Sequence, residues 1–157
     1  YKRQPLKIAF PHLEACLLDS LKKRVNFLEE TFALLKLENI TAIHGRAEEF
    51  AKNKAYREQY DLCVSRAVSN LATLSEYCLP YVKVGGNFIS YKSGTVQEEL
   101  QQAEKAVKIL GGKIQDVVYF NLPDSEIQRS LVVIEKMKPT PGRYPRKAGT
   151  PLKEPLS

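Results

Sequence analysis

The sequence has few of the residues on which disulfide or metal chemistry depends, and it lacks long apolar runs. Its 157 residues contain no stretch of about 18 apolar side chains, which excludes a membrane-spanning helix, and no apolar core of a signal peptide near the first residue. Cys16, Cys63 and Cys78 are an odd number of cysteines without C-x-x-C spacing, and each lies in an apolar run. We therefore expect reduced core thiols in a cytoplasmic protein. We interpret the two histidines, His12 and His44, as structural, and expect no metal site.

Positive charge is concentrated in one part of the sequence. The net charge of the chain is +6, and residues 136–157 carry +5 of it with a single acidic residue, Glu154. The cations of this region are Lys136, Lys138, Arg143, Arg146, Lys147 and Lys153. A nearly neutral body with a basic tail favours an anionic partner, and nucleic acid is the commonest one for a cytosolic protein. The alternative is a solvated tail that only improves solubility.

The same region is rich in proline, which sets its expected conformation. Prolines at positions 139, 141, 145, 151 and 155 cannot continue a helix or a central strand. We therefore divide the chain into a domain at residues 1–137 and a basic, proline-rich tail at residues 138–157. The tail is expected to be extended, and either draped over the body or ordered by its ligand.

Short apolar runs alternate with amphipathic segments along the body. The runs typical of buried parallel strands are residues 15–19, 40–44, 61–65 and 87–91. Two further β-rich runs, residues 113–122 and 129–137, are joined by a polar turn and predict a terminal antiparallel pair.

Helices are expected between these runs. Apolar side chains recur with helical spacing from Leu21 to Leu35, where Ser20 can supply the cap, and again from Val96 to Leu110. A short helix is expected in GRAEEF, and another over residues 70–82, closed by Gly85–Gly86 unless Pro80 ends it early. The order predicts an α/β fold with a doubly wound, mostly parallel sheet that ends in an antiparallel strand pair.

Three chemically informative positions follow predicted strands. Ligands of such sheets bind at the carboxyl ends of the strands, where Asp19, the pair Ala47–Glu48 and Arg66 are expected. Asp19 can accept hydrogen bonds from both ribose hydroxyls, backbone groups at Ala47–Glu48 can bind adenine, and Arg66 can meet an anionic group. The alternatives are a helix-dipole charge at Asp19, an ordinary helix start at Ala47–Glu48, and a local ion pair for Arg66. Lys92 and Arg129 are further strand-edge cations, each more simply explained, if taken alone, as solvated.

Several segments together resemble one family. LLDSLKKRVNFLEE, HGRAEEF, YDLCVSRAVSNLATLSEYCLP, KVGGNFISYK and KPTPGRYPRKAGTP are similar to the GidB (RsmG) family, bacterial 16S ribosomal RNA guanine-N7 methyltransferases that use S-adenosylmethionine. The resemblance covers nearly the whole chain from Pro5. It implies a Rossmann-like methyltransferase fold in which Asp19 contacts the cofactor ribose, Ala47 and Glu48 flank its adenine, and Arg66 contacts the cofactor and the RNA.

The resemblance and the charge of the tail together predict a site for the nucleic acid. We expect Arg66 and Lys92 to be the catalytic side chains, and 16S ribosomal RNA or the small ribosomal subunit to be the partner. The residues expected to contact RNA are Arg129, Arg143, Arg146 and Lys147. The sequence does not indicate an oligomeric state.

One departure from the family pattern concerns the start of the chain. The family has a first strand and a glycine-rich loop before the helix that matches PLKIAFP, whereas this sequence has YKRQ there. We therefore expect that the sequence lacks both features, as a fragment or a truncated reading frame would. The alternative function is then a truncated or degraded methyltransferase that acts only as an RNA-binding module. A nicotinamide-dependent dehydrogenase shares the sheet and Asp19, but it needs G-x-G-x-x-G and leaves the basic tail unexplained.

Overall fold

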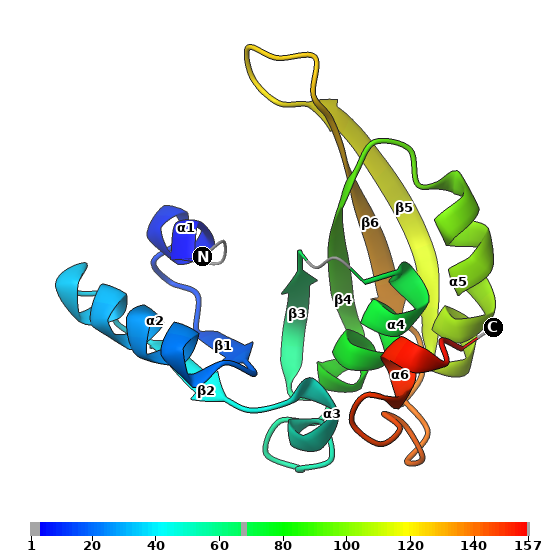
Figure 1. Cartoon of the computed structure of the whole chain (residues 1–157), viewed down its shortest axis with the longest axis horizontal. Helices are drawn as coiled ribbons and strands as arrows, with labels where there is room; N and C mark the ends of the chain where they lie inside the picture. Colours follow the sequence, from blue (N-terminus) through cyan, green and yellow to red (C-terminus); the bar gives the residue numbers. More distant parts are fainter. Residues whose placement is uncertain (1–3, 67–68, 157) are drawn as a thin grey trace. The chain divides into compact units, whose positions relative to one another are not determined.

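The structure, a computed structural model, describes residues 4–66 and 69–156 (Figure 1). The chain divides into two compact units, Tyr1–Glu49 and Phe50–Ser157. Among the described residues, the expected sheet is divided between these units, with two strands in the first and four in the second.

The first unit is a strand–helix–strand element preceded by a short helix. Its two strands pair in parallel, and Leu17 of the first packs against Leu28 and Phe32 of the intervening helix. The strand bounds agree with those predicted, because apolar runs bounded by polar residues mark buried strands clearly. The elements are α1 (Gln4–Ala9), β1 (Ala15–Asp19), α2 (Lys22–Leu34), β2 (Ile40–His44) and α3 (Ala47–Phe50), which runs into the second unit.

The start of α2 differs from the prediction. Ser20 is not the capping residue; Leu21 holds the N-cap position, and its side chain makes no capping bond. The carboxylate of Asp19 takes over part of this role, since its Oδ1 accepts a hydrogen bond from the Leu21 backbone N–H at 2.9 Å. A carboxylate near a helix N-terminus is favoured by the helix dipole.

The second unit is built on a four-stranded sheet in the order β3-β4-β6-β5. The pair β3–β4 is parallel, whereas β4–β6 and β5–β6 are antiparallel, so the predicted terminal antiparallel pair is confirmed. The strands are β3 (Tyr60–Ser65), β4 (Val82–Ser93), β5 (Gly112–Asn121) and β6 (Gln128–Lys136). The helices are α4 (Leu71–Cys78), the single-turn η1 (Leu79–Tyr81), α5 (Gln97–Ile109) and α6 (Thr150–Lys153).

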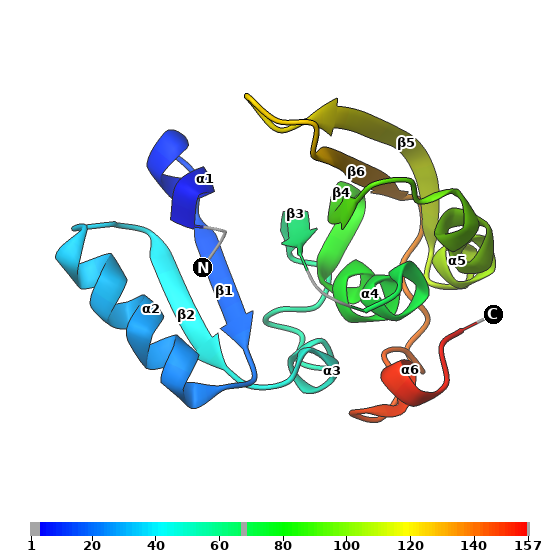
Figure 2. The ribbon, with the colours of Figure 1, turned by 45° about the horizontal axis from the view of Figure 1, so that its top comes forward.

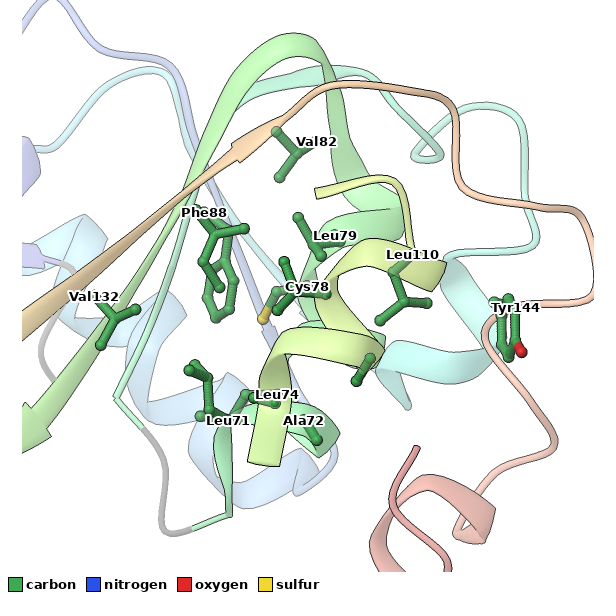
Figure 3. Close-up of a cluster of buried hydrophobic side chains, with 14 of the residues drawn as sticks. Leu71, Ala72, Leu74, Cys78, Leu79, Val82, Phe88, Leu110, Val132 and Tyr144 are labelled. Atoms are coloured by element: carbon green, nitrogen blue, oxygen red, sulfur yellow. The ribbon is translucent and has the colours of Figure 1, made fainter. Parts of the chain in front are cut away.

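The core of this unit lies where α4 and α5 meet the sheet. Figure 3 shows Phe88 of β4, Val132 of β6 and Leu74 of α4 in this cluster, with Leu110 at the end of α5. Phe88, Val132 and Leu110 are fully buried. Burial of a side chain of this size stabilises a fold by about 1.5–3 kcal/mol. The predicted apolar face from Val96 to Leu110 is the face that α5 turns to this core.

The predicted helix over residues 70–82 is too long. Helix α4 ends at Cys78, and η1, which contains Pro80, leads directly into β4 at Val82. Proline lacks the N–H that a continuing helix needs. The helix therefore ends early, before Pro80, which is the alternative given in the prediction. Gly85 and Gly86 therefore do not close a helix; they lie inside β4, which begins before the predicted strand of residues 87–91. A Cβ at position 86 would lie 2.5 Å from the carbonyl oxygen of Asp61, so only glycine allows this close approach of β3.

The tail packs against the rest of the second unit, which was one of the two expected arrangements, but it is not wholly extended. Residues Thr150–Lys153 form α6, with proline in its first turn, where the missing N–H costs nothing. The hydroxyl of Thr73 donates to the Pro151 carbonyl at 2.8 Å, which ties α6 to α4. Tyr144 is buried and belongs to the hydrophobic core.

Lys136, one of the cations counted in the basic region, is inside the molecule. Its side chain is fully buried, and its Nζ donates to the Leu79 carbonyl and to Thr140 Oγ1, each at 2.6 Å. The Glu58 carboxylate lies 3.2 Å away. Burial lowers the pKa of Lys136 below its usual value of 10.5, and the attraction of Glu58 opposes this shift only in part.

Lys136 therefore predicts an alkaline dependence of stability. Between the lowered pKa and 10.5 the unfolded chain binds a proton that the folded chain does not, so the free energy of unfolding should rise with pH there, by up to about 1.4 kcal/mol per pH unit. Urea unfolding between about pH 8 and 10.5 measures this rise. The Lys136→Met variant should lose it, and parallel pH profiles for the two proteins would contradict the assignment.

Candidate functional site

Asp19 ends β1 at the carboxyl edge of the first sheet. Its side chain is one-quarter exposed. Besides the bond from Leu21, the carboxylate has, among the described residues, only a long contact, 3.5 Å from Oδ2 to the Arg24 guanidinium. Asp19 thus has the local helix-start role that was one alternative, and it keeps acceptor capacity on Oδ2 for hydroxyl groups of a ligand.

Ala47 and Glu48 follow β2 at the same edge. The register pairs Asp19 with His44, so the ends of the two strands lie side by side, and the Gly45 N–H donates to the Asp19 carbonyl at 3.0 Å. The Glu48 side chain is buried, whereas Ala47 is half-buried. The structure therefore brings Asp19 and the start of α3 together, as the order of strands predicts.

Arg66, Lys92 and Arg129 lie at one edge of the second sheet. Arg66 directly follows β3 and is exposed. The register pairs Ser65 with Ser90 and Ser93 with Arg129, which places Lys92 beside them. Arg129 is half-buried, and its Nη1 donates to the neighbouring Gln128 carbonyl at 2.9 Å. This end of the sheet thus carries three cations, which lie on or directly after three neighbouring strands.

Lys92 is held more tightly than a solvated cation would be. Its side chain is only 9% exposed, and its Nζ donates to the Glu99 carboxylate at 2.6 Å and to the Ser69 carbonyl at 3.0 Å. These bonds join β4 to the start of α5 and to Ser69, just before α4. The geometry gives Lys92 a positioning role at the edge that Arg66 occupies; a catalytic role stays a prediction.

The three tail cations predicted to contact RNA differ in their surroundings. Arg143 is exposed, with its guanidinium 5.0 Å from the ring centre of Tyr144, and Lys147 is exposed as well. Arg146 instead forms a double hydrogen bond with Glu76 of α4, a fully buried carboxylate, with a closest distance of 2.8 Å. This partner raises the pKa of Arg146 above its usual value. Contact between Arg146 and RNA stays a prediction, since the guanidinium already has a structural partner.

The predicted site residues fall into separate groups. Arg66, Lys92 and Arg129 lie at the carboxyl end of β3 and β4, whereas the start of the tail lies at the opposite end, because Lys136 pairs with Gly112 and Asn87 with Glu135. Figure 1 shows the tail at the end of the sheet far from the β5–β6 turn. The structure does not bring the two groups together. Asp19 belongs to the other unit, so a cleft shared by Asp19 and Arg66 stays a prediction.

Three charged residues that anchor the tail were not singled out from the sequence. Arg57, Glu58 and Glu76 bind tail residues 82 to 87 positions away, or 70 positions away for Glu76. Only Glu76 carried a signal, because it interrupts an apolar helical segment, where a carboxylate needs a partner.

The described part of the chain shows no cluster of three or more His, Cys, Asp or Glu side chains that could hold a metal ion. Nor does any helix within residues 4–66 and 69–156 have the length and apolar character needed to cross a membrane.

Comparison with known proteins identifies close relatives. A family model, described as "GidB: rRNA small subunit methyltransferase G", matches residues 4–132. Ribosomal RNA small subunit methyltransferase G of Lachnoclostridium phytofermentans is 57% identical over 152 residues, and that of Clostridium novyi is 53% identical. Each alignment covers 97% of this chain, and the chain spans 63% of the length of each relative.

Solved structures support the fold independently. The chain superposes on M. jannaschii TYW2 in complex with AdoMet with a TM-score of 0.62 and 13% identity, covering 85% of this chain and 63% of that one. An rRNA methylase from Streptococcus thermophilus gives a TM-score of 0.55 and 17% identity, with 78% and 73% coverage. The Rossmann-like methyltransferase fold expected from the sequence is confirmed.

The Glu76–Arg146 pair predicts that these residues contribute to stability. Arg146→Ala should lower the free energy of unfolding by about 2–3 kcal/mol, because the buried Glu76 carboxylate keeps only the bond from the backbone N–H of residue 146. Arg143→Ala is the matched control and should change stability by less than about 0.5 kcal/mol. Chemical unfolding of the two variants measures both effects; equal losses would mean that the pair contributes nothing specific.

Proposed function

Because the chain belongs to the GidB family of rRNA small subunit methyltransferase G, we propose that it serves in the transfer of a methyl group from S-adenosylmethionine to guanine N7 of 16S ribosomal RNA in the cytoplasm. The observation that carries the proposal is 57% identity over 97% of the chain to a methyltransferase of that name. The small ribosomal subunit, or its RNA, is the proposed partner.

The residues at the edge of the first sheet fit the cofactor chemically. Asp19 offers a partly exposed carboxylate whose Oδ2 has only one long contact within the described part of the chain, which suits hydrogen bonds from ribose hydroxyls. Ala47 and Glu48 begin α3 beside it and would flank the adenine. S-adenosylmethionine supplies an electrophilic methyl group when it is bound.

Methyl transfer to guanine N7 does not require acid–base catalysis by a side chain. Guanine N7 carries a lone pair and no proton, so no residue needs to act as a general base. What the protein must do is align the reacting groups and stabilise charge. Arg66, exposed at the end of β3, is the residue we assign to the anionic groups of the cofactor or the RNA. Lys92 donates a hydrogen bond to the Ser69 carbonyl and so holds the backbone just before α4.

The proposal predicts that Asp19 governs cofactor binding. Asp19→Asn keeps an oxygen that can accept from Leu21 but loses the negative charge, so the affinity for S-adenosylmethionine should fall about tenfold or more. Isothermal titration calorimetry measures it, with Glu29→Gln, an exposed acid on α2, as the control. Equal affinities for the two variants would contradict the role of Asp19.

The reaction itself predicts labelled 7-methylguanine in 16S ribosomal RNA. Small subunits that lack this methylation, incubated with the protein and labelled S-adenosylmethionine, should gain label, and nuclease digestion with mass spectrometry identifies the base. Arg66→Ala should lower the transfer rate at least tenfold, and Arg66→Lys should restore part of it, since the charge is kept. RNA binding without any transfer by the unmodified chain would instead favour the RNA-binding module.

A further inference from the structure

Two exposed lysines lie close to the basic tail although they are far from it in sequence. Lys52 and Lys54 belong to the turn that connects α3 to β3, and both are exposed. Figures 1 and 2 show this turn beside the first loops of the tail.

One guanidinium group makes several of the contacts between the two segments. Arg57 Nη1 donates to the Ala51 carbonyl at 3.1 Å and to the Tyr144 carbonyl at 2.9 Å. Because a single nitrogen binds both carbonyls, the backbone at Ala51 lies next to the backbone at Tyr144. Lys52 is the residue after Ala51, and Arg143 is the residue before Tyr144. The turn that carries the two lysines therefore meets the tail next to its exposed arginine, Arg143.

Two of the acidic groups near this junction have cationic partners. Glu58 accepts from the Thr140 N–H at 2.7 Å and lies 3.2 Å from Lys136 Nζ. Glu76 is paired with Arg146. The cations left exposed on the two segments are Lys52, Lys54, Lys138, Arg143, Lys147 and Lys153. They outnumber the exposed acids Glu154 of the tail and Glu49, three residues before Lys52, so the net charge of the two segments is positive.

The junction is also fixed before any ligand arrives. Arg57 Nη2 donates to the Thr140 carbonyl at 2.6 Å, and the buried Tyr144 and Lys136 hold the tail on both sides of Pro141. A surface that is already ordered loses less conformational entropy on binding than a flexible tail does.

We propose that Lys52 and Lys54 form, together with Arg143 and Lys147, one preformed surface that binds the phosphates of the RNA. This inference rests on the proposed function for the nature of the partner. Lysine and arginine bind phosphates as charges and release counterions, which makes the affinity depend on salt.

The test compares two variants that lose equal charge. Lys52→Ala with Lys54→Ala should weaken binding of 16S ribosomal RNA roughly tenfold or more at 0.1 M salt. The slope of log affinity against log salt concentration should become smaller in magnitude by about 1.4 to 1.8, the value for two phosphate contacts. Lys23→Ala with Lys105→Ala removes two exposed helical lysines elsewhere and should leave the slope nearly unchanged. Two controls distinguish a loss of charge from a loss of folding. The unfolding midpoint of each variant shows whether it is folded, and Lys52→Arg with Lys54→Arg, which keeps both charges, should bind RNA normally.

The outcomes distinguish this inference from the proposed function. If the unmodified protein methylates 16S ribosomal RNA but the Lys52/Lys54 variant binds like the control variant, the surface is wrong and the function stands. If no methyl transfer occurs while the variant still weakens RNA binding, the surface stands without the function. If the Lys52/Lys54 variant lost as much affinity for polyglutamate as for RNA, the proposal would be overturned, since the surface would then bind any acidic polymer.

Discussion

The Arg57 guanidinium fixes the path of the chain after the last strand, and much of the second unit depends on that path. One planar group binds carbonyl oxygens of Ala51, Thr140 and Tyr144, so the turn before β3 and the segment after β6 are held together. A guanidinium presents five donors in a rigid fork, which suits it to collect several backbone oxygens where no sheet is available. Tyr144 can then enter the hydrophobic core, and Arg146 can reach Glu76.

Charge in the tail consequently has two physical uses. Lys136 and Arg146 are bound to carboxylates inside or partly inside the molecule, where an unpaired charge would be costly. Arg143 and Lys147 remain in solvent and keep their charge available to a partner. A count of net charge cannot separate these uses, since both kinds of residue contribute one positive charge to the sequence.

The sequence predicts local elements well and long-range contacts poorly. The runs ending at Asp19 and His44 are strands as expected, because short apolar or β-branched runs favour a strand over a helix. The glycines inside β4 were misassigned, since glycine closes helices as readily as it admits a neighbouring backbone, and only the position of Asp61 decides between the two. Among candidate site residues, the ends of the predicted strands located Asp19 and Ala47–Glu48 together, whereas nothing local in the sequence indicates that Arg146 faces Glu76.

The separation in sequence between the tail and its anchors has a consequence for synthesis. Glu76 is made 70 residues before Arg146, and Arg57 precedes the carbonyl of Tyr144 by 87 residues. A nascent chain that has emerged only as far as β6 has α4 with a carboxylate that lacks its guanidinium partner. The second unit can therefore form its sheet early, but it reaches its full stability only after the tail has left the ribosome.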